Sequence, residues 1–138
     1  LPEVIFTDPL RLKQILYNVI GNSIKFTSLG YVQVIVRHED DKIVFNVSDT
    51  GIGIKKEYWG KLFQNFGQGN PEISRDYGGT GLGLVLSRRL SRVLGGDVDI
   101  VNSIPGLGSE FIIVVKLTDQ KDSADERIAN TDLGYFAN

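Results

Sequence analysis

The apolar residues of this chain change between a helical and a strand-like period twice, and this alternation restricts the fold more than any other feature. Asp8-Pro9 is a helix start signal, and the apolar spacing that follows predicts a helix over residues 8–26. Alternating, valine-rich segments at 31–37 and 43–49 predict a β-hairpin around a polar turn. Beyond it, the pattern predicts a short helix at 55–63, a long loop at 64–79, a second amphipathic helix at 82–94 and strands at 97–102 and 110–117. Helices that alternate with hairpins indicate an α+β fold, a two-layer α/β sandwich.

The composition of the chain limits the number of domains and excludes several kinds of binding site and partner. A chain of 138 residues with 41% hydrophobic residues suits a single domain, which we expect over residues 1–117. Residues 118–138 hold five acidic and two basic residues and are expected to form a polar acidic tail or linker. The absence of cysteine excludes thiolate metal sites, and a net charge of −2 without a basic field argues against nucleic acid as a partner. No apolar run approaches the roughly 20 residues that span a membrane, so no direct membrane contact is expected.

One face of the predicted helix 8–26 carries polar side chains but no carboxylate. At 100° per residue, Arg11, Gln14, Asn18, Asn22 and Lys25 fall within an arc of about 80°. Asparagine is a poor helix former, so two of them one turn apart are an odd choice for solubility alone. Amide oxygens suit a hard cation such as Mg²⁺, and a lysine suits phosphate. The pattern is compatible with a solvated face or with a ligand site.

Asp49 continues the apolar face of the strand 43–49 and is expected to be partly buried. A buried carboxylate is costly without hydrogen bonds, so Asp49 should accept them from the protein or from a ligand. Gly51 and Gly53 follow, and they allow a sharp turn or the close approach of something flat. The alternative is a tight turn with a capping aspartate.

Residues 77–84 contain four glycines and lead into the second helix. Exposed amides at a helix N-terminus attract phosphate, although a flexible hinge would give the same composition. The preceding segment 64–79 could close over a ligand as a lid. The glycine spacing fits neither a dinucleotide fingerprint nor a Walker A loop.

Taken in order, five segments resemble the sequence boxes of one family. NVIGNSIKFT (18–27) resembles an N box, DTGIG (49–53) a first glycine box, LFQNFGQ (62–68) an F box, GGTGLGL (78–84) a second glycine box, and GLGSEF (106–111) the final glycine turn. Over roughly residues 1–117 the chain is therefore similar to the catalytic, ATP-binding domain of sensor histidine kinases. These belong to the GHKL superfamily, with DNA gyrase B, Hsp90 and MutL. The resemblance implies the GHKL (Bergerat) sandwich, with a mixed, mostly antiparallel sheet packed on helices.

The resemblance also implies ATP and Mg²⁺ as cofactors and gives roles to individual residues. Asn22 would bind Mg²⁺ with Asn18 beside it, and Lys25 would reach a phosphate, which makes these three the candidate catalytic residues. Asp49 would accept a hydrogen bond from the adenine amino group, and nearby backbone would approach the nucleotide closely. The remaining implied nucleotide contacts are Gly51, Gly53, Phe63, Phe66, Gly79, Thr80, Gly81, Leu82 and Gly83, of which the two phenylalanines would anchor the lid. Three features depart from the family pattern: Glu110 replaces a threonine or serine, Asp76 a basic residue, and the segment 55–63 contains the unusual pair Trp59-Gly60.

The implied reaction needs an acceptor outside this chain. Related ATPases carry a glutamate one turn before the magnesium asparagine, and Asn18 in that place favours transfer to another group over hydrolysis. His38 is the single histidine and is expected at the surface near a turn. The resemblance therefore implies a histidine on a separate dimerisation/histidine phosphotransfer domain of the same full-length protein, then a response regulator receiver domain, at a cytoplasmic location. The alternatives are a nucleotide-binding regulatory or interaction module without transfer activity, and an ATPase or serine kinase of the same superfamily.

Overall fold

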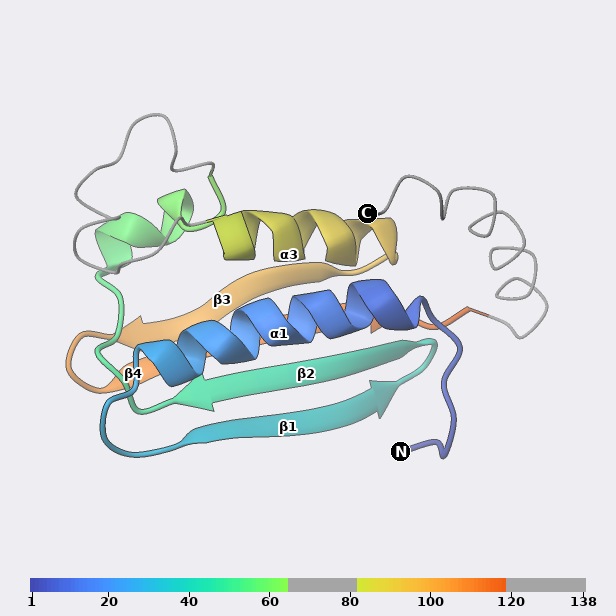
Figure 1. Cartoon of the computed structure of the whole chain (residues 1–138), viewed down its shortest axis with the longest axis horizontal. Coiled ribbons are helices and arrows are strands. Elements are labelled where there is room, and N and C mark those ends of the chain that lie inside the picture. Colours follow the sequence, from blue (N-terminus) through green and yellow to red (C-terminus); the bar gives the residue numbers. More distant parts are fainter. Residues whose placement is uncertain (65–81, 119–138) are drawn as a thin grey trace.

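Two helices lie side by side on one face of an antiparallel sheet (Figure 1). The computed structural model describes residues 1–64 and 82–118. Within these residues the sheet has four strands in the order β1-β2-β4-β3, all paired antiparallel. The helices are α1 (Pro9–Lys25) and α3 (Leu82–Val93), the 3₁₀ helix is η1 (Lys56–Lys61), and the strands are β1 (Val32–Glu39), β2 (Lys42–Asp49), β3 (Asp97–Ile104) and β4 (Gly108–Lys116). The predicted two-layer α/β sandwich is confirmed, and no parallel pair occurs among the described strands.

Helix α1 begins where its sequence signal predicts. The Asp8 side chain accepts hydrogen bonds from the backbone N–H groups of Leu10 (3.1 Å) and Arg11 (3.2 Å), while Pro9 occupies the first helical position. At the other end, the N–H of Phe26 bonds to the Asn22 carbonyl at 3.0 Å. The capped start fixes the helical phase, and this phase decides which residues face the sheet.

Differences from the predicted bounds have local causes. Strand β1 runs two residues further than expected, to Glu39, because Asp40 adopts a positive φ of 52° and the hairpin turns within two residues. The segment 55–63 was expected to form a helix and forms a 3₁₀ helix over Lys56–Lys61. It begins without a side-chain cap and contains Gly60, which disfavours a longer α-helix.

The core lies between the sheet and the helices. Strand register places Phe45 opposite Ile113 and Val47 opposite Phe111 on the side facing the helices. They pack in one cluster with apolar residues of both helices, among them Ile15, Val19 and Leu84. Burying a side chain of this size contributes roughly 1.5–3 kcal/mol, so the row is a major source of stability. Asp49 stands at the end of this row, directly opposite Ser109.

None of the described helices is both long and apolar enough to cross a bilayer.

Candidate functional site

The Asp49 carboxylate ties together three segments at one end of the sheet. Its Oδ1 atom accepts hydrogen bonds from the backbone N–H of Gly51 (2.9 Å) and from that of Ser109 on β4 (3.2 Å). The side chain is half-buried, and its second oxygen has no hydrogen bond to any residue within 1–64 or 82–118. The Asp49 carboxylate is therefore held in a fixed orientation, and its second oxygen remains available to accept a hydrogen bond from a ligand.

The two glycines after Asp49 are required by the protein's own backbone. A Cβ atom on Gly51 would collide with the carbonyl oxygen of Phe26, at the end of α1. A Cβ atom on Gly53 would collide with the carbonyl oxygen of Ile104, and Gly53 has a φ of +69°. The hydrogen bond from the Ile52 N–H to the Phe26 carbonyl (3.1 Å) fastens the same junction. Close packing within the fold accounts for both glycines without a ligand.

The asparagines of α1 face the first turn of α3, not open solvent. The Asn18 side chain donates a hydrogen bond to the Gly83 carbonyl at 3.3 Å. A Cβ atom placed on Gly83 would lie 3.8 Å from Cγ of Asn18 and 3.9 Å from Nδ2 of Asn22. The structure therefore brings together two segments that are far apart in the sequence, the N-box-like helix face and the end of the glycine cluster.

The two asparagines differ in how far their amides are engaged. The Oδ1 atom of Asn18 accepts from Nε2 of Gln14 at 3.2 Å, so both ends of its amide are used. The half-buried Asn22 side chain makes no hydrogen bond to another described residue. Asn22 thus has the freer oxygen for a cation.

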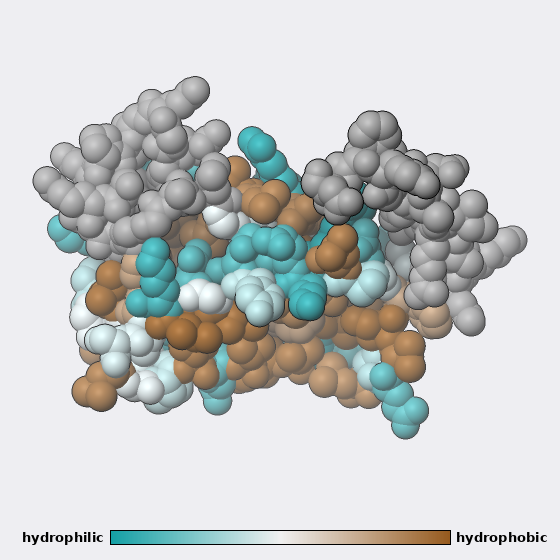
Figure 2. All heavy atoms as spheres, viewed as in Figure 1, coloured by the Kyte–Doolittle hydropathy of each residue, from teal (hydrophilic) through white to brown (hydrophobic). Residues whose placement is uncertain are grey.

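The polar face of α1 has a basic side chain at each end. Lys25 is exposed in the last turn, with Nζ 5.4 Å from the centre of the Phe26 ring, whereas Arg11 in the first turn is ion-paired with Asp8 at 3.2 Å. In Figure 2, hydrophilic groups gather along the boundary between α1 and α3. In the described part of the chain no group of three His, Asp or Glu side chains could hold a metal ion. Amide oxygens and cationic side chains are therefore the groups that this face offers to a ligand.

Phe63, the first phenylalanine of the F-box-like segment, is fixed just beyond η1. It is partly buried against the core, and the guanidinium of Arg88 lies 3.8 Å above the centre of its ring. Phe66, Gly79, Thr80 and Gly81 lie outside the described residues, and so does the side chain of Leu82. Their implied contacts with a nucleotide stay predictions.

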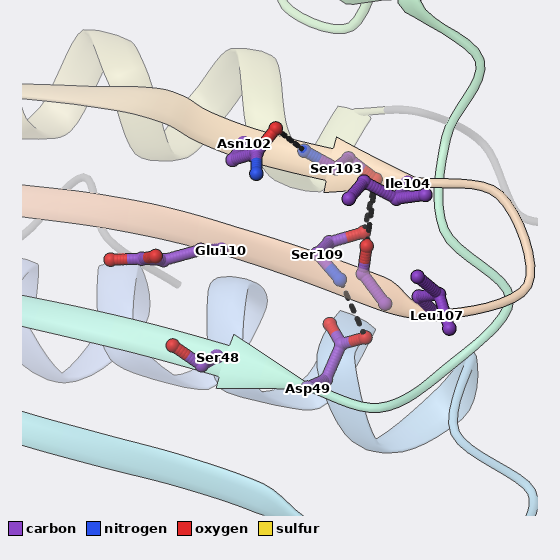
Figure 3. A pocket seen from close by; sticks show the side chains of 9 residues that line it. Ser48, Asp49, Asn102, Ser103, Ile104, Leu107, Ser109 and Glu110 are labelled. Carbon is purple, nitrogen blue, oxygen red and sulfur yellow. Dashed lines mark hydrogen bonds between the residues drawn. The ribbon is translucent and has the colours of Figure 1, made fainter.

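Glu110 points away from the helices. It pairs with Ser48, and its carboxylate accepts a hydrogen bond from Nδ2 of Asn46 at 2.9 Å. Figure 3 shows it apart from the Asp49–Ser109 contact, although Asp49 also borders the same depression of about 240 Å³. That depression includes no residue of α1, so the departure from the family pattern at Glu110 lies on the other face of the sheet from the asparagine pair.

Sequence reasoning missed the serines that support Asp49. The Ser103 and Ser109 hydroxyls lie 2.8 Å apart, and Ser103 Oγ also accepts from the Ile54 N–H at 2.6 Å. These bonds hold the turn after Gly53 against the β3–β4 hairpin. A serine at a strand end is too common to be singled out from sequence alone.

Comparisons with known proteins agree with this arrangement. Residues 7–119 match the family described as histidine kinase-, DNA gyrase B-, and HSP90-like ATPase. The chain is 43% identical to the sensor protein GacS of Pseudomonas syringae pv. syringae, an alignment that covers 96% of this chain and 15% of that protein. It is 41% identical to the signal transduction histidine-protein kinase BarA of Escherichia coli strain K12, over 84% of this chain and 13% of that protein.

Comparison with a solved structure supports the same family. The crystal structure of full-length ShkA in complex with AMPPNP superposes with a TM-score of 0.69 and 35% identity, over 83% of this chain and 23% of that chain. The fold and the arrangement of its boxes define an ATP-binding domain of the sensor histidine kinase type. The chain belongs to the histidine kinase-, DNA gyrase B- and HSP90-like ATPase family. It spans about 15% of the length of the curated relatives named here.

Proposed function

We propose that this domain binds Mg²⁺-ATP and donates the γ-phosphate to a histidine on a separate domain. The observation that carries the proposal is the alignment of three features along α1. Asn18 and Asn22 face Gly83 at the start of α3, and the Asp49 turn meets the C-terminal end of α1. At 1.5 Å per residue, the stretch from Asn18 to Phe26 spans about 12 Å, so a ligand bound at both places would lie along the C-terminal half of α1.

The base is proposed to bind at the Asp49 end. A carboxylate oxygen without a protein partner can accept a hydrogen bond from an exocyclic amino group, which adenine has and guanine lacks at that position. The two N–H bonds to the other oxygen hold the carboxylate in place before binding. Such preorganisation supports selectivity, because a mismatched base would leave a half-buried acceptor unpaired.

The phosphates and the magnesium ion are proposed to bind between α1 and the start of α3. Asn22 would contribute an amide oxygen to the cation, since its amide is free of other described residues, and Asn18 would stand beside it. Lys25 would contact a phosphate as a point charge, and the first turn of α3 adds the positive end of its helix dipole. Phosphoryl transfer depends chiefly on positioning and charge stabilisation, which such a set can provide.

The acceptor is proposed to come from another domain. His38 is exposed on β1 and pairs with Ile43, which lies near the end of β2 opposite to Asp49. Strand β1 is at one edge of the sheet and β3, on which α3 packs, is at the other edge, about 14 Å away at three strand spacings, so His38 is poorly placed for a phosphate bound near Gly83. We place the acceptor on a dimerisation/histidine phosphotransfer domain of the full-length protein and the next acceptor on a response regulator receiver domain. The domain would work in the cytoplasm, where ATP is supplied.

Calorimetric titration with a non-hydrolysable ATP analogue, with and without Mg²⁺, tests the nucleotide site. Binding should weaken when Mg²⁺ is removed, and by at least tenfold in Asp49→Asn and Asn22→Ala. The matched controls are Ser48→Ala, next to Asp49 but on the opposite face of β2, and Gln33→Ala, an exposed amide on β1. A folded wild-type chain that binds no nucleotide at millimolar concentration would refute the proposal.

Transfer is tested separately. The domain is mixed with ATP and with a histidine-bearing domain of a related sensor kinase, and acid-labile phosphate on that domain is measured. Nucleotide binding without any transfer would favour the alternative, a nucleotide-binding regulatory or interaction module.

A further inference from the structure

Arg88 on α3 makes a flat stacking contact with Phe63. Its guanidinium carbon lies 3.8 Å from the centre of the phenyl ring, close enough for a strong cation–π contact. These residues belong to different elements, the segment after η1 and the middle of α3. The contact therefore joins the chain just before residues 65–81 to the helix that follows them.

The edge of the same guanidinium is bound to β3. Nε donates to the Val98 carbonyl at 3.0 Å and lies 3.3 Å from Oδ1 of Asp97, while a terminal nitrogen lies 3.3 Å from Oδ1 of Asp99. The Arg88 side chain is only 23% exposed. A planar guanidinium can stack with its face while it donates from its edge, whereas a lysine ammonium has no such plane.

These contacts constrain the distance between two proposed nucleotide contacts. Gly83 lies on α3, five residues before Arg88, and Phe63 is held against the same helix by the stack. The carboxylates of Asp97 and Asp99 fix Arg88 from the sheet side, so Phe63, α3 and β3 are held as one unit. A ligand that needs Phe63 and Gly83 at a fixed separation would depend on Arg88 without touching it.

We propose that Arg88 is a positioning residue for the nucleotide site. It acts by holding Phe63 at a fixed distance from the start of α3. This inference rests on the proposed function. It adds a residue that belongs to none of the family-like boxes.

Titrations with the non-hydrolysable ATP analogue and Mg²⁺ test the inference, at a temperature where each variant is fully folded by circular dichroism. Arg88→Gln should weaken binding at least fivefold, and Arg88→Lys should restore it only in part, because the ammonium keeps the charge but not the stack. The matched control is Arg92→Gln. Arg92 lies one turn further along α3, is 59% exposed and also pairs with Asp97 at 3.3 Å. Its substitution should change the dissociation constant less than twofold.

A double-mutant cycle separates positioning from general stability. Phe63→Leu keeps apolar bulk but removes the aromatic ring, and this single substitution should by itself weaken nucleotide binding. Adding Arg88→Gln to it should then cost less than a further twofold, because the stack is already gone. Unchanged nucleotide affinity in Arg88→Gln, or fully additive losses of affinity in the double variant, would overturn the inference about Arg88. The proposed function would still stand in that case, provided that the unsubstituted chain binds the nucleotide. A wild-type chain that binds no nucleotide would overturn both.

Discussion

The Asn18 side chain donates a hydrogen bond to the Gly83 carbonyl at 3.3 Å, across 65 residues of sequence. The same carbonyl accepts from the Ser87 hydroxyl at 2.7 Å, so the first turn of α3 is bound both to α1 and to its own next turn. This pair fixes the spacing between the asparagines of α1 and the start of α3. The proposed phosphate site depends on that spacing.

Asn18→Asp tests the hydrogen bond because it changes the amide to a carboxylate of the same shape and similar helix propensity. At neutral pH the new carboxylate cannot donate and faces a carbonyl oxygen, so the free energy of unfolding should fall by about 1–2 kcal/mol. In acid the protonated carboxyl can donate again, so the loss should shrink as the pH falls. Urea denaturation at pH 7 and in mild acid measures both effects.

Gln33→Glu is the matched control for Asn18→Asp. It changes an amide to a carboxylate at an exposed position on β1, away from Asn18 and from Gly83. Its effect on stability should stay within about 0.5 kcal/mol. Equal losses in the two variants would show that charge, not the contact with Gly83, is responsible.

Gly51→Ala should be severely destabilising. The added Cβ would overlap the carbonyl oxygen of Phe26, a backbone atom that cannot move without breaking the bond from the Ile52 N–H. We expect a loss of at least 3 kcal/mol, or no folded protein. Gly21→Ala is the control, since a Cβ there meets nothing within 4 Å and helix propensity should raise stability by about 1 kcal/mol. A folded Gly51→Ala variant with wild-type melting temperature would disprove the packing argument.

Two buried serines should respond in opposite ways to alanine. Ser23 is 3% exposed, and its hydroxyl has no hydrogen-bond partner in the described part of the chain. Ser87 is fully buried with its hydroxyl bonded to the Gly83 carbonyl at 2.7 Å. Ser23→Ala should therefore stabilise the domain by about 1 kcal/mol, because it removes an unpaired buried polar group.

Ser87→Ala gains the same helix propensity but loses a buried hydrogen bond, so it should be neutral or destabilising by up to about 1 kcal/mol. Thermal denaturation of both variants gives the comparison. Equal shifts in melting temperature would mean that the Ser23 hydroxyl has a partner of its own.

Local features of the sequence predicted the fold well, and long-range contacts explain the rest. The start of α1 and the strand alternation up to Asp49 depend on side chains within a few residues, so the pattern carries them. The polar face of α1 was also visible in the sequence pattern. Its position against Gly83 was not, because the packing of α1 on α3 is a tertiary contact. For the same reason Ser109, 60 residues from Asp49, could not be identified as its hydrogen-bond donor.

Arg88 shows the same limit more clearly. In the sequence it is one of three arginines within five residues of an amphipathic helix, a pattern typical of a solvated face. Its contacts are with Phe63, just after η1, and with Asp97 and Asp99 on β3, two elements far apart from each other in the sequence. Only the packing of those elements distinguishes Arg88 from Arg89 and Arg92.

Gly83→Ala separates a glycine kept for a ligand from one kept for the fold. A Cβ at Gly83 would lie in ordinary contact, 3.7 Å from Cβ of Asn18 and 3.9 Å from Nδ2 of Asn22, so the domain should fold with unchanged or slightly higher stability. The methyl group would, however, fill the space between the asparagines and α3 in which we place the phosphates. Affinity for the Mg²⁺-bound ATP analogue should fall at least tenfold, while affinity for adenosine, which has no phosphate, should change less than twofold. Equal losses for both ligands would move the proposed phosphate site away from Gly83, and wild-type affinity for both would remove Gly83 from the site.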